Sequence, residues 1–321
     1  MKKLKQRIKV FIYKIIFQLK DIKDENTLII FSDQRNGSTW LMETIQKRIK
    51  KSVVNWEPLQ EDNRVVPKRF NFSWKPILSS ELKDDEIASF FKKIHRFQQL
   101  NSWTTSQNTY SEILNSKFVI TKYVKANLLV PFLANNLNFK NQPIFLIRHP
   151  IDTCLSQINH FSNNKSKIKK IKEVNLFINK YYPEIELFDE NDIYNDLEIQ
   201  IINWCINNCY TINKLKGLKI KVIYYSDLLI NTNREIRDIL NSINSSLITN
   251  ENMSVEENFR LPSFTTDENY FKKDPIEQLN KNINTLDKGT KDRIQSIFDH
   301  FDFKLYTAYS PLPNKEFFNE E

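Results

Sequence analysis

The sequence predicts an α/β fold: a doubly wound sheet of mainly parallel strands, flanked by helices in three layers. Four short apolar runs have the composition of strands buried on both faces, and each leads directly into a helical pattern. This repeated strand-then-helix order indicates parallel strands joined by crossover helices, because parallel neighbours need a long connection. In such sheets ligands bind beyond the carboxyl ends of the strands.

The four strand and helix pairs follow one another along the chain. They are 27–32 with 38–51, 118–124 with 127–137, 143–149 with 151–161, and 219–229 with 231–243. A long polar region, 163–196, and a further helix, 197–217, separate the last two pairs. No linker or fixed-period repeat divides the chain. We therefore predict one domain over 25–310, preceded by a basic amphipathic segment, 1–24, and followed by a disordered tail, 311–321.

Composition limits the class of protein. A chain of 321 residues that is 40% hydrophobic can build a substantial core. Its 47 basic and 39 acidic residues leave a net charge of +8, which favours an anionic partner: a nucleotide, an anionic glycan, nucleic acid or anionic lipid. Three cysteines are too few for a disulfide framework, so we expect a reducing, cytoplasmic compartment.

The first twenty residues alternate lysines with apolar side chains. Their apolar runs are too short to span a membrane, and no small-residue cleavage site of a secretory signal follows them. Two interpretations remain open: a helix packed on the domain, and a basic amphipathic helix in peripheral contact with an anionic membrane.

The loop after the first strand is a candidate anion site. Gly37 separates Arg35 from Ser38 and Thr39 where the chain turns into a helix. A helix N-terminus presents unpaired N–H groups, glycine lets the backbone approach a ligand, and an arginine fork suits phosphate or sulfate. An ordinary turn capped by Ser38 is the alternative. Neither the Gly-Lys-[Ser/Thr] ending of a triphosphate-binding loop nor a three-glycine dinucleotide fingerprint is present.

A second candidate anion site, which we also call a grip because two side chains would hold one phosphate, follows the third strand. Arg148 ends that strand, Pro150 is suited to start the next helix, and Ser156 lies about two turns into it. One guanidinium and one hydroxyl would hold a single phosphate from two sides. The alternative is that Arg148 pairs with Asp152 and that Ser156 is a neutral helix residue.

Together and in this order, the two loops resemble the PAPS-dependent sulfotransferase family, where PAPS is 3′-phosphoadenosine-5′-phosphosulfate. The family's phosphosulfate loop, [Lys/Arg]-Ser-Gly-[Ser/Thr]-[Ser/Thr]-Trp, corresponds here to Arg35, Asn36, Gly37, Ser38, Thr39 and Trp40. Its 3′-phosphate motif, Arg-x-Pro with a serine eight residues after the arginine, is matched by Arg148, Pro150 and Ser156, and Tyr225 matches a tyrosine near the adenine. Over 27–309 the resemblance implies a P-loop-like fold, PAPS as co-substrate, adenosine 3′,5′-bisphosphate as product, and no metal.

Departures from the family pattern bear on the acceptor. Arg35 stands where the cytosolic small-molecule branch has lysine and many carbohydrate sulfotransferases have arginine, which favours a hydroxyl of a glycan or glycolipid. Asn36 replaces a serine thought to restrain that lysine, so such gating is not implied. The cytosolic branch's C-terminal contact to the 3′-phosphate has no clear counterpart, and Ser263, Thr265 and Thr266 are the alternatives for it.

Sulfuryl transfer builds charge on the leaving phosphate and needs a base for the acceptor proton. Arg35 is the candidate for the first task, and its role is electrostatic because a guanidinium stays charged. The family's Lys-x-His strand corresponds to Lys122 and Val124, so the histidine is absent. Glu57 resembles the proposed base of the bacterial carbohydrate branch. We predict Glu57 as the base, with a solvated loop carboxylate as the alternative, and Lys122 as a contact to the sulfuryl group or the acceptor.

Three other functions remain open. A nucleic-acid-binding module fits the basic composition, although the motifs predict no nucleic-acid partner. A P-loop-like nucleotide kinase would need a triphosphate-binding lysine that the loop lacks. A catalytically silent PAPS binder would keep both phosphate grips, whose presence favours an active enzyme.

Overall fold

The computed structural model describes residues 2–60, 65–70, 72, 75–161, 171–243, 245–248 and 274–318. The chain forms two compact units. Unit 1 comprises Met1–Ile147, Gly217–Ile223 and Asp227–Lys272, and unit 2 comprises Arg148–Lys216, Tyr224–Ser226 and Lys273–Glu321. Ser263, Thr265 and Thr266 lie outside the described residues.

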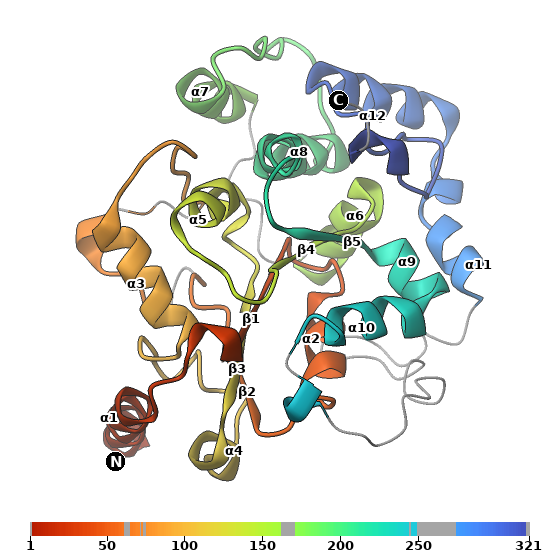
Figure 1. Ribbon diagram of the computed structural model, residues 1–321. Helices are drawn as coiled ribbons and strands as arrows, with labels where there is room; N and C mark the ends of the chain where they lie inside the picture. The colour runs from red at the N-terminus through yellow and green to blue at the C-terminus, as the bar shows by residue number, and fades with distance from the viewer. Residues whose placement is uncertain are drawn as a thin grey trace. The chain divides into compact units, whose positions relative to one another are not determined.

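The helices and strands are labelled in Figure 1. Their bounds are α1 Lys2–Lys20, β1 Thr27–Ser32, α2 Ser38–Gln46, β2 Ser52–Trp56, α3 Asp85–His95, α4 Tyr110–Asn115, β3 Phe118–Tyr123, α5 Val130–Asn136, β4 Ile144–Ile147, α6 Pro150–His160, α7 Ile171–Tyr181, α8 Asp196–Lys214, β5 Lys221–Tyr224, α9 Tyr225–Ile230, α10 Thr232–Leu240, α11 Pro275–Asn280 and α12 Lys288–His300.

The five strands form one sheet in the order β2-β3-β1-β4-β5. Strand β1 is parallel to both β3 and β4, and β2 is parallel to β3. The predicted α/β class with a mainly parallel sheet is therefore confirmed. Because the chain leaves β1 toward β2 and β3 on one side and returns to β4 and β5 on the other, β1 lies at the switch point where parallel sheets open a crevice at their carboxyl ends.

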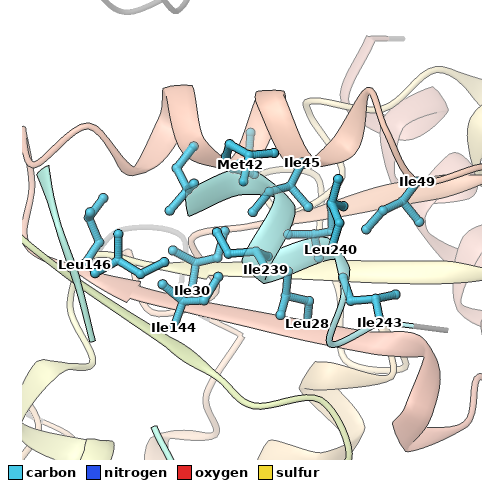
Figure 2. Packing of buried hydrophobic residues seen from close by; sticks show 14 of the residues in the cluster. Leu28, Ile30, Met42, Ile45, Ile49, Ile144, Leu146, Ile239, Leu240 and Ile243 are labelled. Atoms are coloured by element: carbon cyan, nitrogen blue, oxygen red, sulfur yellow. The ribbon is translucent and has the colours of Figure 1, made fainter. Parts of the chain in front are cut away.

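One face of the sheet packs against α2 and α10. Figure 2 shows Leu28 and Ile30 of β1 facing Met42 and Ile45 of α2, all of them buried in one hydrophobic cluster. Residues of α10 complete this cluster. The residues two apart on β1 share this face because strand side chains alternate, so an unbroken apolar run serves both faces of the sheet.

The opposite face packs against α3 and is rich in aromatic rings. Phe31 of β1 and Tyr123 of β3 stack with ring centroids 5.4 Å apart, and His95 of α3 meets the Tyr123 ring edge-on at 5.9 Å. Helices therefore cover both faces of the sheet in unit 1, as the three-layer prediction requires (Figure 1).

Helix α1 packs on unit 1 through one side. Tyr13 and Phe17 are fully buried in a second cluster that includes Val53 of β2. The Lys20 ammonium donates to the carbonyls of Ile113, 2.8 Å away, and of two further residues at the end of α4. These carbonyls lack helical partners, so Lys20 fastens α1 by capping α4. The structure thus confirms the packed-helix interpretation for this side of α1.

In unit 2, α8 packs against α6, α7 and α12. Glu198 closes a capping box at the start of α8 and accepts a 2.6 Å hydrogen bond from Arg293 of α12. Residues 311–318 differ from the predicted disordered tail, because the Asn314 N–H donates to the Leu305 carbonyl and Phe317 is buried. An aromatic side chain with buried surface of its own holds this segment on the unit.

Candidate functional site

The loop between β1 and α2 turns through two left-handed residues. Gly37 has φ 90° and Arg35 has φ 67°. Glycine adopts this conformation freely, whereas a residue with a Cβ is strained there, and such strain gathers at ligand-binding loops. Asn36 is buried, and its side-chain amide donates to the Leu146 carbonyl of β4 at 3.3 Å. In this structure Asn36 therefore fastens the loop to the neighbouring strand.

Helix α2 begins without a side-chain cap. Its N-cap is Gly37, and Ser38 is the first residue inside the helix. The alternative of an ordinary turn capped by Ser38 is therefore wrong. The first-turn N–H groups of an α-helix have no partners within the helix, so this start presents donors and the positive end of the helix dipole. Thr39 is buried there, and Trp40 packs against the α2 core.

The side chain of Lys122, on β3, lies beside the start of α2. Its ammonium donates to the Thr39 hydroxyl at 3.1 Å and to the Glu57 carboxylate at 2.7 Å. The same nitrogen lies 3.7 Å from the centre of the Trp56 ring. Lys122 is 2% exposed, so its side-chain nitrogen is buried between a carboxylate, a hydroxyl and an aromatic face.

Glu57 follows directly after β2 in a left-handed conformation, with φ 42°. Its N–H donates to the Lys122 carbonyl at 3.0 Å, and its side chain is 13% exposed. The alternative of a solvated loop carboxylate is therefore wrong. Two contacts with one lysine, through backbone and side chain, orient this carboxylate at the sheet edge.

The strand register explains why these residues meet. Trp56 of β2 and Ile30 of β1 are both register partners of Lys122 on β3. Lys122 shares the strand face of Ile120, which packs on the α2 side. The carboxyl ends of β1, β2 and β3 thereby bring Arg35, Glu57 and Lys122 to one edge of the sheet.

Electrostatics tie Arg35 to this cluster. Burial lowers the pKa of Lys122, the charge of Glu57 opposes that shift, and the positive charge of Arg35 adds to it. Arg35 thus lies close enough to influence the lysine. Sequence reasoning missed Trp56, whose ring faces the ammonium; its position directly before Glu57 was the available signal.

Unit 2 holds the second candidate grip. Arg148, which directly follows β4, is 6% exposed, and its guanidinium lies 4.5 Å from the centre of the Tyr225 ring. Its Nε lies 3.9 Å from Oδ2 of Asp152, and the other oxygen of that carboxylate, Oδ1, accepts a 2.7 Å hydrogen bond from Asn282. The predicted Arg148–Asp152 alternative is thus present as a long ion pair. The ring of Tyr225, which was predicted to lie near an adenine, packs against this guanidinium.

His149 acts as the N-cap of α6. Its Nδ1 accepts from the Ile151 N–H at 3.2 Å, so Nε2 carries the proton and donates to the Thr307 carbonyl at 3.0 Å. Burial lowers the pKa of His149. The neutral ring therefore fixes the start of the helix after Arg148, with Pro150 at N1. Ser156 lies half-buried in the same helix.

The two candidate grips differ in chemistry. The unit 1 cluster joins a helix N-terminus, two cations and a carboxylate, so it can bind an anion, balance developing charge and accept a proton. The unit 2 cluster joins a permanently charged guanidinium to an aromatic ring, which suits anion binding alone.

Comparison with known proteins gives no matching family model and no matching curated relative. Among solved structures, the chain is similar to the sulfotransferase domain from the curacin biosynthetic pathway, with 15% identity, a TM-score of 0.42, and coverage of 88% of this chain and 99% of that one. It is also similar to a sulfotransferase from Alicyclobacillus acidocaldarius, with 10% identity, a TM-score of 0.35, and coverage of 73% and 87%.

Proposed function

We propose that this protein is a sulfotransferase that moves the sulfuryl group of PAPS to a hydroxyl of a glycan or glycolipid. The observation that carries the proposal is the Glu57–Lys122 ion pair beside the start of α2, which has no side-chain cap. Arg35 lies in the loop that leads into α2. An anion-binding helix start next to an oriented carboxylate is what transfer of an anionic group to a hydroxyl requires.

In the proposed reaction the acceptor oxygen forms a bond to sulfur while the bond from sulfur to the bridging oxygen of the 5′-phosphate breaks. Glu57 takes the acceptor proton. The electron pair of the broken bond stays on the 5′-phosphate, where Arg35 and the N–H groups of Ser38 and Thr39 balance its charge. Lys122 orients Glu57 through its 2.7 Å contact and adds positive charge beside Thr39.

Following the motif resemblance, we assign the 5′-phosphosulfate of the donor to the α2 loop and its 3′-phosphate to Arg148. The acceptor class rests on Arg35, since arginine at this position is shared with many carbohydrate sulfotransferases.

The first test is a calorimetric titration with adenosine 3′,5′-bisphosphate, beside ATP. We expect the bisphosphate to bind and ATP to bind far more weakly. Arg148→Ala should abolish bisphosphate binding, whereas Arg234→Ala, at a side chain 79% exposed, should leave it unchanged. Equal binding of ATP would instead favour a nucleotide kinase, and salt-steep binding to RNA without bisphosphate binding would favour the nucleic-acid module.

The second test follows release of the bisphosphate from PAPS with a panel of acceptors. We expect turnover with saccharides or glycolipids and none with simple phenols. Tight bisphosphate binding without turnover on any acceptor would point to a silent PAPS binder, and turnover confined to phenols would overturn the acceptor assignment.

A further inference from the structure

Helix α1 has a second apolar side that faces away from unit 1. Tyr13 and Phe17 pack into the domain, but six other large apolar side chains of the helix are exposed. They are Leu4, Ile8, Phe11, Ile12, Ile15 and Leu19. Phe11 is 64% exposed and Leu19 81% exposed, so these side chains do not belong to the hydrophobic core.

The six residues form one continuous stripe. They recur with helical spacing, and at 100° per residue they fall within a band about 100° wide, opposite Tyr13 and Phe17. A helix with one packed side needs only one apolar stripe. The second stripe, which we call the outer stripe, is therefore left for a partner outside unit 1.

Charge indicates what that partner is. The helix carries seven Lys and Arg residues and no Asp or Glu. The remaining chain has 40 basic and 39 acidic residues, because the whole chain has 47 and 39. Nearly all of the net charge of +8 thus belongs to α1.

The basic side chains lie on both borders of the outer stripe. Arg7 and Lys14 flank it on one side, and Lys5 and Lys9 on the other, by the same helical geometry. Lys9 also lies over the Tyr13 ring, 5.4 Å from its centre. A shallow groove between α1 and Tyr110 of α4 runs along the second border. An apolar stripe between two basic borders is the arrangement of helices that lie in the headgroup layer of an anionic membrane.

We propose that the outer stripe of α1 binds the surface of an anionic lipid bilayer. The apolar side chains enter the boundary between headgroups and acyl chains, and the basic borders contact lipid phosphates. A second copy of this chain is disfavoured as occupant, since two-fold pairing would bring seven positive charges against seven others. This inference does not depend on the proposed sulfotransferase activity.

No described helix is long and apolar enough to cross a membrane. The proposed contact is accordingly peripheral, and an apolar band with charged borders holds the helix parallel to the surface. Tyr13, Phe17 and the Lys20 cap keep α1 attached to unit 1 at the same time, so the contact requires no detachment of the helix.

The experiment is cosedimentation of the full chain with vesicles of phosphatidylcholine alone and with added phosphatidylglycerol. We expect binding only to the anionic vesicles, weakened by high salt. The triple variant Ile8→Ser/Phe11→Ser/Ile15→Ser should lose more than about tenfold of this binding. The double variant Lys5→Gln/Arg7→Gln should lose roughly fivefold for each charge removed.

The matched control is Leu176→Ser/Ile193→Ser, which removes two exposed apolar side chains of unit 2, 65% and 86% exposed. It should bind vesicles like the original chain, and all variants should unfold at the same temperature because their sites are exposed. Failure to bind anionic vesicles, or equal binding by the triple variant, would overturn the proposal. So would a dimer in light scattering that the triple variant converts to monomer without any vesicle binding.

Discussion

The clusters around Lys122 in unit 1 and Arg148 in unit 2 bury similar charges in different ways. The Lys122 ammonium contacts the Glu57 carboxylate at 2.7 Å, whereas the Arg148 guanidinium lies on the Tyr225 ring and has the Asp152 carboxylate at 3.9 Å. A guanidinium stays charged, so the second cluster offers a fixed positive charge. Under the proposed function, proton transfer is therefore assigned to the Lys122 cluster and anion binding alone to the Arg148 cluster.

The largest expected effect comes from Glu57→Gln. The amide keeps the shape of the side chain but cannot take the acceptor proton, so turnover should fall about 10²–10⁴-fold. Bisphosphate affinity, measured by calorimetry, should stay within a few-fold. An unchanged turnover number would show that Glu57 is not the base, and the Lys122 cluster would then have no catalytic role that distinguishes it from the Arg148 cluster.

The next effect contrasts two buried histidines. Burial lowers the pKa of His95 from 6.5 to about 3, and its Nε2 has no hydrogen-bond partner among the described residues. The unfolded state therefore binds the proton first, so stability is full above pH 6.5 and falls as the pH drops toward 3. The loss is on the order of 5 kcal/mol.

Urea unfolding across this pH range measures that loss. His95→Phe should flatten the acid dependence, because the ring lies among Phe91, Tyr123 and Phe139 and makes aromatic contacts there. His149→Phe in unit 2 should instead cost about 1 kcal/mol at neutral pH by removing the cap on α6. A steep acid dependence that persists in the His95 variant would show that another group controls it.

A third prediction concerns the buried ion pair. Lys122→Met leaves the Glu57 carboxylate, 13% exposed, without its ammonium and should lower the free energy of unfolding by about 3 kcal/mol. The double variant Lys122→Met/Glu57→Gln should recover part of this loss, because no unpaired charge remains. Denaturant unfolding of all four proteins gives the coupling, and simple additivity would mean that the pair is not coupled.

The smallest effect tests the other cluster. Arg148→Lys keeps the charge but loses the flat contact with Tyr225 and the forked donors, so bisphosphate affinity should fall about tenfold. Arg234→Lys is the control at an exposed site. Equal affinity of the Arg148 variant would mean that charge alone matters there.

Much of the fold could be predicted from sequence pattern. The runs that became β1, β3, β4 and β5 are apolar on both faces, and each precedes a helix. Strand β2 was not among the predicted strands, because no helix directly follows its five residues; pairing with β3 makes it a strand. The packed segment around Phe317 was also not predicted, since its burial depends on contacts within unit 2.

The sequence predicted most residues of the candidate site but few of the contacts that they make. Arg35, Gly37, Glu57 and Lys122 were identified from loop chemistry and motif resemblance, and the structure brings them to one sheet edge. The contact of Trp56 with the Lys122 ammonium and the hydrogen bond from Asn36 to Leu146 join residues that are distant in the chain. A local pattern cannot reveal such partners.

Local patterns suffice to predict the α/β class, the sharp turn at Gly37 and the basic, apolar character of α1, because hydrophobic periodicity, glycine and charge are properties of neighbouring residues. The contact of Lys122 with Glu57, and the burial of Tyr13 and Phe17 but not of Phe11 or Leu19, depend on the folded chain. Strand register and helix packing select which of several equally apolar or charged side chains lose contact with water.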